Sequence, residues 1–253
     1  MSGCRRAPPR LPCFVAPMLA QPAAPFDAPE FLFEVKWDGT RALAFIEGGR
    51  SRLVSRQRQD RTDRYPELAS LAGWPPGTVL DGEIVVLRDG QPDFRLVQAR
   101  EQTRSPLRVR LGAQVHPVTY LVFDLLYAAH RPLLTCPLAE RRDRLQTLVR
   151  AQGMPGVVLS EGVVGAGRAL FQEVCRRGLE GVVAKRLNSR YQPGRRTEAW
   201  RKIKPAHTAV CAILGFVPGS DRGIRSLLVA EDIGGGLRYA GQVERGLDTG
   251  LRA

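Results

Sequence analysis

Lysine is scarce in this chain, although positive charge is not. Of the 38 Lys and Arg residues only four are lysines, namely Lys36, Lys185, Lys202 and Lys204. Arg keeps its proton near neutral pH, whereas Lys can lose it and then act as a nucleophile. Each lysine kept in such an Arg-rich chain is therefore a candidate for chemistry that Arg cannot perform. The alternative is that the four lysines occur at these positions by chance. The residues that flank each lysine help to decide between the two interpretations.

Paired cysteines and long apolar runs are also missing. The five cysteines are odd in number and scattered, without a CxxC pair or a Cys/His cluster, which argues against a disulfide framework and a zinc site. No apolar segment approaches the roughly 18 residues of a membrane span. Pro12 and Pro17 interrupt the apolar stretch near the N-terminus, so no export signal is expected. The sequence thus predicts a cytoplasmic protein with reduced thiols and no membrane partner.

Acidic residues are too few to balance the basic ones. The 25 Asp and Glu residues leave a formal net charge of +13. This charge indicates a polyanionic partner, and nucleic acid is favoured over a membrane because no basic amphipathic helix stands out. The alternative is a solvated, Arg-biased surface, since basic charge steers binding without specifying it.

Hydrophobic periodicity predicts mixed helices and strands up to Pro205, and strands alone after it. The predicted strands are residues 31–37, 41–46, 53–55, 78–87, 118–127, 157–159, 181–187 and 200–204. Helices are predicted at 65–71, 94–101, 137–151 and 168–177. After Pro205, strands are predicted at 209–217, 226–231 and 237–243. We therefore expect two domains, 1–205 and 206–253, the second with fewer strands than the roughly five of a closed small barrel.

Lys36 lies at the end of an apolar strand, in the stretch Glu34-Val35-Lys36-Trp37-Asp38-Gly39. A lysine held there in a partly dry pocket can attack an electrophile. The alternative is a surface lysine in a hairpin, and KxDG alone is a weak signal.

Two further strands carry candidate ligand-binding residues. Glu83 enters the apolar strand 84–87 and is suited to a ribose hydroxyl or a metal, although a solvated strand end explains it equally well. Phe123 lies in an almost wholly apolar strand and can stack on a base, although core packing is the common role of such a residue.

Lys202 and Lys204 alternate along the strand 200–204 and so share one face. Two ammonium groups aimed in the same direction suit a phosphate chain. Glu180, which precedes the strand 181–187, can hold Mg²⁺, because that ion prefers carboxylate and phosphate oxygens. The alternative is an edge strand with a polar outer face.

Taken together, these segments resemble the adenylation domain of ATP-dependent DNA ligases, within the covalent nucleotidyltransferase superfamily. The likeness is greatest to the ligase domain of bacterial ligase D from non-homologous end joining. The matching segments occur in family order: Pro17-Met18-Leu19-Ala20, EVKWDGTRA (34–42), Ser55-Arg56-Gln57, LDGEIVVL (80–87), Phe123-Asp124-Leu125-Leu126-Tyr127, EGVVAKR (180–186) and WRKIK (200–204). The resemblance implies an α+β fold: a nucleotidyltransferase (ATP-grasp-like) domain of antiparallel sheets and helices, followed by a partial, all-β OB-fold.

The resemblance also implies a role for each matching residue. Lys36 would be the nucleophile that forms a lysyl-AMP phosphoramidate. Glu34 would read the adenine amino group, Phe123 would stack on adenine, and Arg41 and Glu83 would contact the ribose. The remaining implied contacts are those of Arg56 with the nucleotide or the 5′-phosphate of a nick, of Glu180 with Mg²⁺ (or Mn²⁺), and of Lys202 and Lys204 with the triphosphate.

The implied reaction is ATP-dependent sealing of nicked or broken double-stranded DNA in the bacterial nucleoid. End-joining proteins or fused polymerase and nuclease domains are the further partners that the resemblance suggests. Gln57 stands where family members commonly have Asn. No segment after residue 204 matches the last basic motif of the family's OB-fold, so we expect an incomplete OB-fold and slow self-adenylation. The alternatives are an RNA ligase or capping-type nucleotidyltransferase, and a non-catalytic basic DNA-binding remnant of a ligase.

Overall fold

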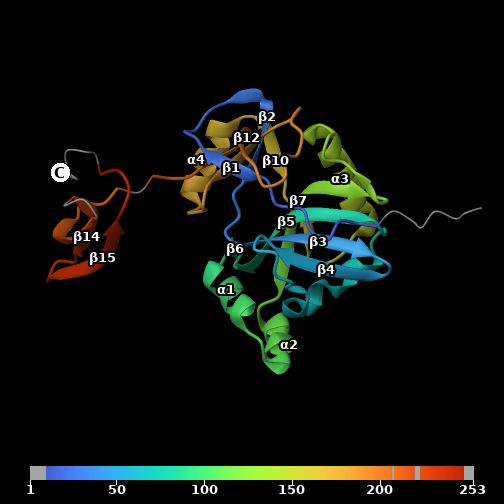
Figure 1. Cartoon of the computed structure of the whole chain (residues 1–253), viewed down its shortest axis with the longest axis horizontal. Coiled ribbons are helices and arrows are strands. Elements are labelled where there is room, and N and C mark those ends of the chain that lie inside the picture. Colours follow the sequence, from blue (N-terminus) through green and yellow to red (C-terminus); the bar gives the residue numbers. More distant parts are fainter. Residues whose placement is uncertain (1–9, 207, 220–222, 248–253) are drawn as a thin grey trace, which may run out of the picture. The chain divides into compact units, whose positions relative to one another are not determined.

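The computed structural model describes residues 10–206, 208–219 and 223–247 (Figure 1). Contacts divide the chain into two compact units, residues 1–205 and 206–253, and each is described here by itself. None of the helices in the described residues is long and apolar enough to cross a membrane.

The first sheet of the larger unit has five strands in the order β1-β12-β11-β2-β10. These strands are β1 (Leu19–Pro22), β12 (Arg196–Ile203), β11 (Val182–Arg186), β2 (Ala28–Val35) and β10 (Gly162–Gly165). All pairs are antiparallel except β1 with β12. Phe31, Phe33 and Ile203 form a core with Val174 of helix α4 (Gly167–Arg176), so this helix covers one face of the sheet.

The second sheet follows the order β4-β3-β5-β7-β8. Its members are β4 (Arg50–Ser55), β3 (Thr40–Glu47), β5 (Thr78–Arg88), β7 (Val118–Ala128) and β8 (Arg131–Pro132), with β6 (Gln91–Pro92) on β5 and β9 (Val157–Leu159) parallel to β7. Helices α1 (Phe94–Gln102), α2 (Pro106–Val115) and α3 (Leu138–Gln152) belong to this half, with the 3₁₀ segments η1 (Thr62–Arg64) and η2 (Pro66–Gly73). One buried cluster packs η2 and α3 against this sheet.

A separate apolar cluster joins the two sheets. Leu43, Val79 and Phe123 of the second sheet pack with Trp200 of the first, and the Phe123 and Trp200 rings meet edge to face with centroids 6.1 Å apart. Met18, fully buried, belongs to the same cluster. Burial of these side chains fixes how the two sheets face each other, and the cavity described below lies at their contact.

The predicted α+β class is confirmed, and most predicted elements are found. The predicted helix 65–71 is instead 3₁₀ helix, Pro66–Gly73. Helix α2 was not predicted, although Leu107, Leu111 and Val115 recur every four residues as on one face of a helix; these three side chains are exposed in the structure. Strands β1 and β10 were also missed: both are four residues long and are defined by pairing with distant strands.

The smaller unit contains the three strands predicted from the sequence. β13 (Ala212–Pro218), β14 (Ile224–Asp232) and β15 (Leu237–Val243) form one antiparallel sheet in that order. Ser226 and Ala230 of the central strand are fully buried, whereas most residues of β13 and β15 are exposed.

Candidate active site

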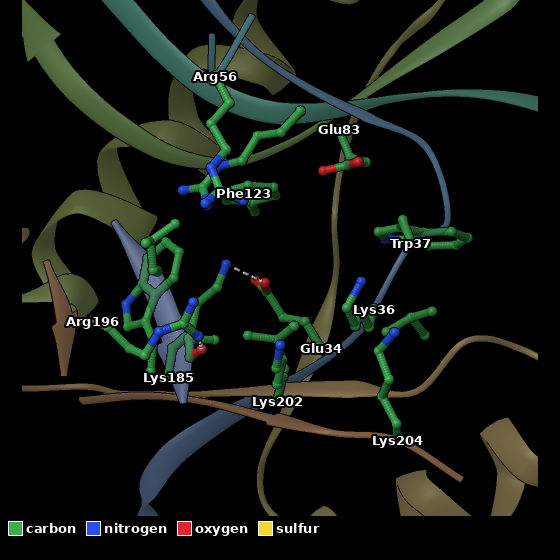
Figure 2. Close-up of a pocket in the computed structure, with 16 residues that line it drawn as sticks. Glu34, Lys36, Trp37, Arg56, Glu83, Phe123, Lys185, Arg196, Lys202 and Lys204 are labelled. Carbon is green, nitrogen blue, oxygen red and sulfur yellow. Dashed lines mark hydrogen bonds and ion pairs between the residues drawn. The ribbon is translucent and has the colours of Figure 1, made fainter. Parts of the chain in front are cut away.

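A cavity of about 280 Å³ lies between the two sheets of the larger unit (Figure 2). Its size is near the lower end of small-molecule sites, which span roughly 300–1,000 Å³. Both sheets contribute to its walls: the lining residues are Leu19, Ala20, Glu34, Val35, Lys36, Trp37, Arg41, Arg56, Glu83, Phe123, Val183, Lys185, Arg196, Trp200, Lys202 and Lys204. All four lysines of the chain are among them.

Lys36 follows the last residue of β2 and is fixed by both its backbone and its side chain. Its backbone N–H donates to Gly181 O at 2.8 Å, which brings the neighbouring Glu180 alongside. Its Nζ donates to Glu180 Oε2 at 2.5 Å, and the other oxygen of that carboxylate lies 2.6 Å from Lys204 Nζ. One carboxylate therefore sits between two of the four lysines.

The KWDG stretch ends in glycine because there is no room for a side chain at position 39. A Cβ atom at this position would lie 2.3 Å from the backbone oxygen of Ile84 and 2.8 Å from Val85 Cγ1. Only glycine lets the chain pass this close to β5 as it enters β3. The close approach holds Lys36, before the turn, near Glu83 on β5.

Arg41 and Glu83 are direct cross-strand partners on β3 and β5. Asp81 holds the Arg41 guanidinium through two hydrogen bonds of 2.9 and 2.6 Å, and Arg41 also donates to Met18 O at 2.6 Å. Burial lowers the pKa of Arg41, but the Asp81 carboxylate more than offsets this and the net shift is upward. Burial also raises the pKa of Glu83 to about 8, although Arg41 and Lys36 oppose the shift.

Glu34 forms a buried ion pair at the floor of the cavity. Its carboxylate is 2% exposed and accepts a hydrogen bond from Lys185 Nζ at 2.5 Å. The Lys185 ammonium lies 4.0 Å from the centroid of the Phe123 ring and 4.7 Å from that of Trp200. Arg142, from α3, approaches the other Glu34 oxygen at 3.1 Å. Figure 2 shows Lys185 and Glu34 reaching toward each other beside Phe123.

Further cationic side chains line the cavity, namely Lys202, Lys204, Arg196 and Arg56. Figure 2 shows Arg56 on the side of Phe123, Arg196 on the side of Lys185, and Lys204 on the side of Lys36. Burial, followed by repulsion from Arg196, Lys204 and Lys36, lowers the pKa of Lys202. An anion placed beside Lys202 would relieve that repulsion, so this part of the cavity is suited to phosphate groups.

The carboxylates near Lys36 decide whether a divalent cation fits. The described residues hold no group of three or more His, Cys, Asp or Glu side chains in metal-binding positions. Mg²⁺, however, is commonly held by one or two carboxylates together with phosphate oxygens and water. Glu180 provides one carboxylate. The pKa of Asp38 is raised, first by burial and second by repulsion from Glu180, so the Asp38 carboxylate is a second one near the same position. The residues present fit Mg²⁺ shared with a phosphate-bearing ligand.

The structure brings the sequence-predicted residues together. Eight of them line the cavity: Glu34, Lys36, Arg41, Arg56, Glu83, Phe123, Lys202 and Lys204. Glu180 is not in its lining but is tied to Lys36 and Lys204 by ion pairs. Sequence reasoning gave no role to Trp37, Lys185 or Arg196. The scarcity of lysine was the signal that pointed to Lys185.

Comparison with known proteins gives a consistent result. Residues 17–204 match the family described as ATP dependent DNA ligase domain. The multifunctional non-homologous end joining DNA repair protein LigD of Mycobacterium tuberculosis is 39% identical over 241 residues, which are 92% of this chain and 30% of that protein. LigD of Pseudomonas aeruginosa is 36% identical over 245 residues, 93% of this chain and 28% of that protein. The chain thus spans about 30% of the length of these relatives.

A solved structure is similar as well. The mycobacterial DNA ligase D complexed with ATP and MES superposes with a TM-score of 0.66 at 37% identity. The match covers 92% of this chain and 73% of that one. The predicted nucleotidyltransferase fold is therefore confirmed by a solved structure at 37% identity.

Proposed function

Because the chain belongs to the ATP-dependent DNA ligase family, we propose that it takes AMP from ATP onto Lys36 and passes it to DNA. The single observation that supports this most is the Lys36 ammonium at the wall of a cavity that is also lined by Glu34, Phe123, Lys202 and Lys204. Glu34 and Phe123 suit a nucleoside, and the two lysines suit its phosphates.

In the proposed first step, neutral Lys36 Nζ attacks the α-phosphorus of ATP. A P–N bond forms, the bond from the α-phosphorus to the bridging oxygen breaks, and pyrophosphate leaves with that oxygen. Lys202 and Lys204 offset the charge of the leaving group, which lowers the barrier to phosphoryl transfer. The amine gives up its proton to water, because Glu180, its partner at 2.5 Å in the ligand-free chain, is the proposed ligand of Mg²⁺.

We further propose that Glu180 holds Mg²⁺ with the nucleotide phosphates. Bound there, the ion would supply charge neutralisation at the reacting phosphate. Lys204 and Lys36, which share this carboxylate in the ligand-free chain, would then be released toward the phosphates. Holding the reacting groups in one place is itself a large part of such catalysis.

For the nucleoside we propose contacts with four side chains that line the cavity. Phe123 stacks on adenine, Glu34 accepts from its amino group, and Arg41 with Glu83 contacts the ribose. Asp81 fixes the Arg41 guanidinium through two hydrogen bonds, so little side-chain freedom is lost when the ribose binds.

The proposed substrate is nicked or broken duplex DNA, which places the activity on the bacterial nucleoid. In the later steps the 5′-phosphate at the break takes AMP from Lys36, and the 3′-hydroxyl then displaces AMP. The net charge of +13 supports binding to the phosphate backbone, and we propose that Arg56, which lines the cavity, contacts the nicked phosphate. The description of the relatives as end-joining proteins makes polymerase and nuclease domains the proposed associates.

The mass of the purified chain tests the proposal. After incubation with ATP and Mg²⁺ the intact protein should gain the mass of one AMP, and pyrophosphate should remove it. Labelling with GTP instead of ATP would indicate a capping-type enzyme. DNA binding with a steep salt dependence and no added nucleotide would indicate a non-catalytic DNA-binding protein.

A further inference from the structure

Helix α2 presents a stripe of apolar side chains to solvent. Leu107, Leu111 and Val115 are 69%, 56% and 59% exposed and recur every four residues along the helix. With 3.6 residues per turn, these positions lie within about 80° of one another around the helix axis. Figure 1 shows α2 at the outer edge of the larger unit, and none of its residues lines the cavity. These three side chains, the α2 stripe, therefore form a surface separate from the candidate active site.

A buried arginine fixes the direction in which the α2 stripe points. Arg100 of α1 donates from Nη1 to Gly112 O at 3.2 Å and to His116 O at 2.7 Å. A Cβ atom at position 112 would lie 2.9 Å from Arg100 Cδ, so the absence of a side chain there lets the arginine pass against the helix. Val109, on the side of the helix opposite the stripe, is buried. The stripe cannot turn inward unless these contacts break.

Arginines flank the α2 stripe on both sides. Around the helix axis, Arg108 lies on one side of the stripe and Arg110 on the other, and both are exposed. Arg104, which precedes the helix, is exposed as well. The helix contains no acidic residue, and no carboxylate among the described residues forms an ion pair with any of these three arginines. Their charge is therefore left for acidic groups from outside this part of the chain.

We propose that the α2 stripe docks an acidic amphipathic helix of a partner protein. The apolar residues of that helix would pack on the stripe, and its carboxylates would pair with the flanking arginines. Apolar surface rimmed by polar residues commonly marks such an interface. The inference concerns a surface outside the cavity and does not depend on the proposed ligase activity.

The other candidate occupants fit this surface less well. DNA phosphates would pair with the arginines but leave three aliphatic side chains without an apolar partner. A second copy of the chain would set two faces of like charge against each other. Helices that lie in a membrane surface commonly carry Trp or Phe on the apolar face, and α2 has no aromatic residue.

A synthetic helical peptide serves as the probe, with leucine at positions i, i+3, i+4 and i+7 and glutamate at the flanking positions. Fluorescence anisotropy of the labelled peptide measures its binding to the full chain. We expect saturable binding that weakens with added salt, because salt screens the carboxylate–arginine pairs. A matched peptide with lysine in place of glutamate should bind at least about tenfold more weakly. Equal binding of the two peptides, or no binding of the glutamate peptide, overturns the proposal.

Val115→Gln and Val164→Gln are a matched pair of variants for the apolar contact. The two valines are 59% and 56% exposed, and only the first belongs to the α2 stripe, since Val164 lies on β10. Val115→Gln should weaken binding of the glutamate peptide by about fivefold or more, because an aliphatic contact is lost. Val164→Gln should leave it unchanged. Both substitutions replace an exposed side chain, so thermal unfolding should stay close to that of the wild type. Equal affinities in the two variants overturn the proposal.

Arg108→Glu tests the flanking charge. Its control is Arg150→Glu, which changes the net charge equally at an exposed position of α3. Arg108→Glu should weaken binding of the glutamate peptide and reduce its salt dependence, whereas Arg150→Glu should change both much less. Equal effects would show that net charge, not the arginines beside the stripe, attracts the peptide, and the proposed site would be wrong.

Titrations with nicked duplex DNA and with phosphatidylserine vesicles address the other occupants. The proposal expects the wild type and Val115→Gln to bind each of these ligands equally and to have the same sedimentation behaviour. A loss of DNA binding, vesicle binding or self-association in Val115→Gln would assign the α2 stripe to that occupant and overturn the proposal. Covalent labelling with ATP should be equal in the two proteins, so the docking surface and the ligase activity are tested separately.

Discussion

Lys36 Nζ and Glu180 Oε2 lie 2.5 Å apart, although 144 positions separate the two residues in the sequence. The hydrogen bond from the Lys36 backbone to Gly181 O makes this contact a consequence of strand geometry rather than of side-chain reach alone. The carboxylate that steadies the ammonium is also the one proposed to hold Mg²⁺. Binding of the cation and freeing of the amine are thus coupled at one side chain.

Lys36→Arg should abolish covalent labelling with AMP. The guanidinium preserves the positive charge and can still pair with Glu180, but it stays protonated near neutral pH and cannot attack phosphorus. Intact-protein mass spectrometry after incubation with ATP and Mg²⁺ measures the outcome. Thermal unfolding close to that of the wild type serves as the control for folding, and residual acid-labile AMP on the variant would remove Lys36 from its proposed role.

Removing both phosphate-facing lysines should affect ATP far more than AMP. Lys202→Ala with Lys204→Ala should weaken ATP binding by about a hundredfold or more, because each of the two lost contacts to a charged group costs on the order of 1.5–3 kcal/mol. AMP binding should change by less than ATP binding. Calorimetric titration with each nucleotide provides the measurement.

Arg201→Ala is the matched control for that pair. Arg201 lies on the same strand, but its guanidinium is placed over the rings of Phe26 and Phe31, away from the cavity lining. The variant loses a positive charge of the same strand without losing a phosphate contact. An equal loss of ATP affinity in Arg201→Ala would show that net charge alone, not placement, governs the binding.

Glu83 should make stability depend on pH in a predictable direction. Its carboxyl has a pKa of about 8 in the folded chain, against an ordinary value of 4.5. Between these values the unfolded chain is ionised at this position and the folded chain is not, so the free energy of unfolding falls as pH rises and levels off above about 8. Glu83→Gln should remove this fall.

Scanning calorimetry gives the thermal unfolding midpoint of Glu83→Gln minus that of the wild type at each pH. This difference should be more positive near pH 8.5 than near pH 5. The control is Glu140→Gln, at an exposed carboxylate on α3, which should show no such trend. A midpoint difference that is the same at both pH values would contradict the assignment of the raised pKa to Glu83.

Much of the cavity was readable from sequence because its residues lie in short, contiguous motifs. The positions of Lys36 and Gly39 depend on one turn. The shared direction of Lys202 and Lys204 depends on the alternation of side chains along one strand. Arg142 and Asp81 were missed because their roles come from contacts between elements: Arg142 reaches Glu34 from a helix, and Asp81 orients Arg41 from a neighbouring strand. No local pattern encodes such pairing.

Asp124 illustrates the same limit and leads to a stability prediction. It interrupts an apolar strand, yet it is fully buried and accepts two hydrogen bonds from Arg141, at 2.7 and 2.9 Å. Arg141 also donates to the backbone oxygens of Cys136 and Ser189 and so ties α3 and the segment after β11 to β7. Asp124→Ala would leave the Arg141 guanidinium buried without its counter-charge.

Asp124→Ala should therefore lower the free energy of unfolding by about 3–5 kcal/mol, the cost of breaking a buried ion pair on one side. Urea denaturation followed by tryptophan fluorescence measures this in the larger unit, because Trp37, Trp74 and Trp200 all belong to it. Glu140→Ala breaks the half-exposed pair with Arg144 on the same helix and should cost no more than about 0.5 kcal/mol. Equal losses in the two variants would mean that burial does not strengthen the Asp124–Arg141 pair, and the proposed anchoring of α3 to β7 would fail.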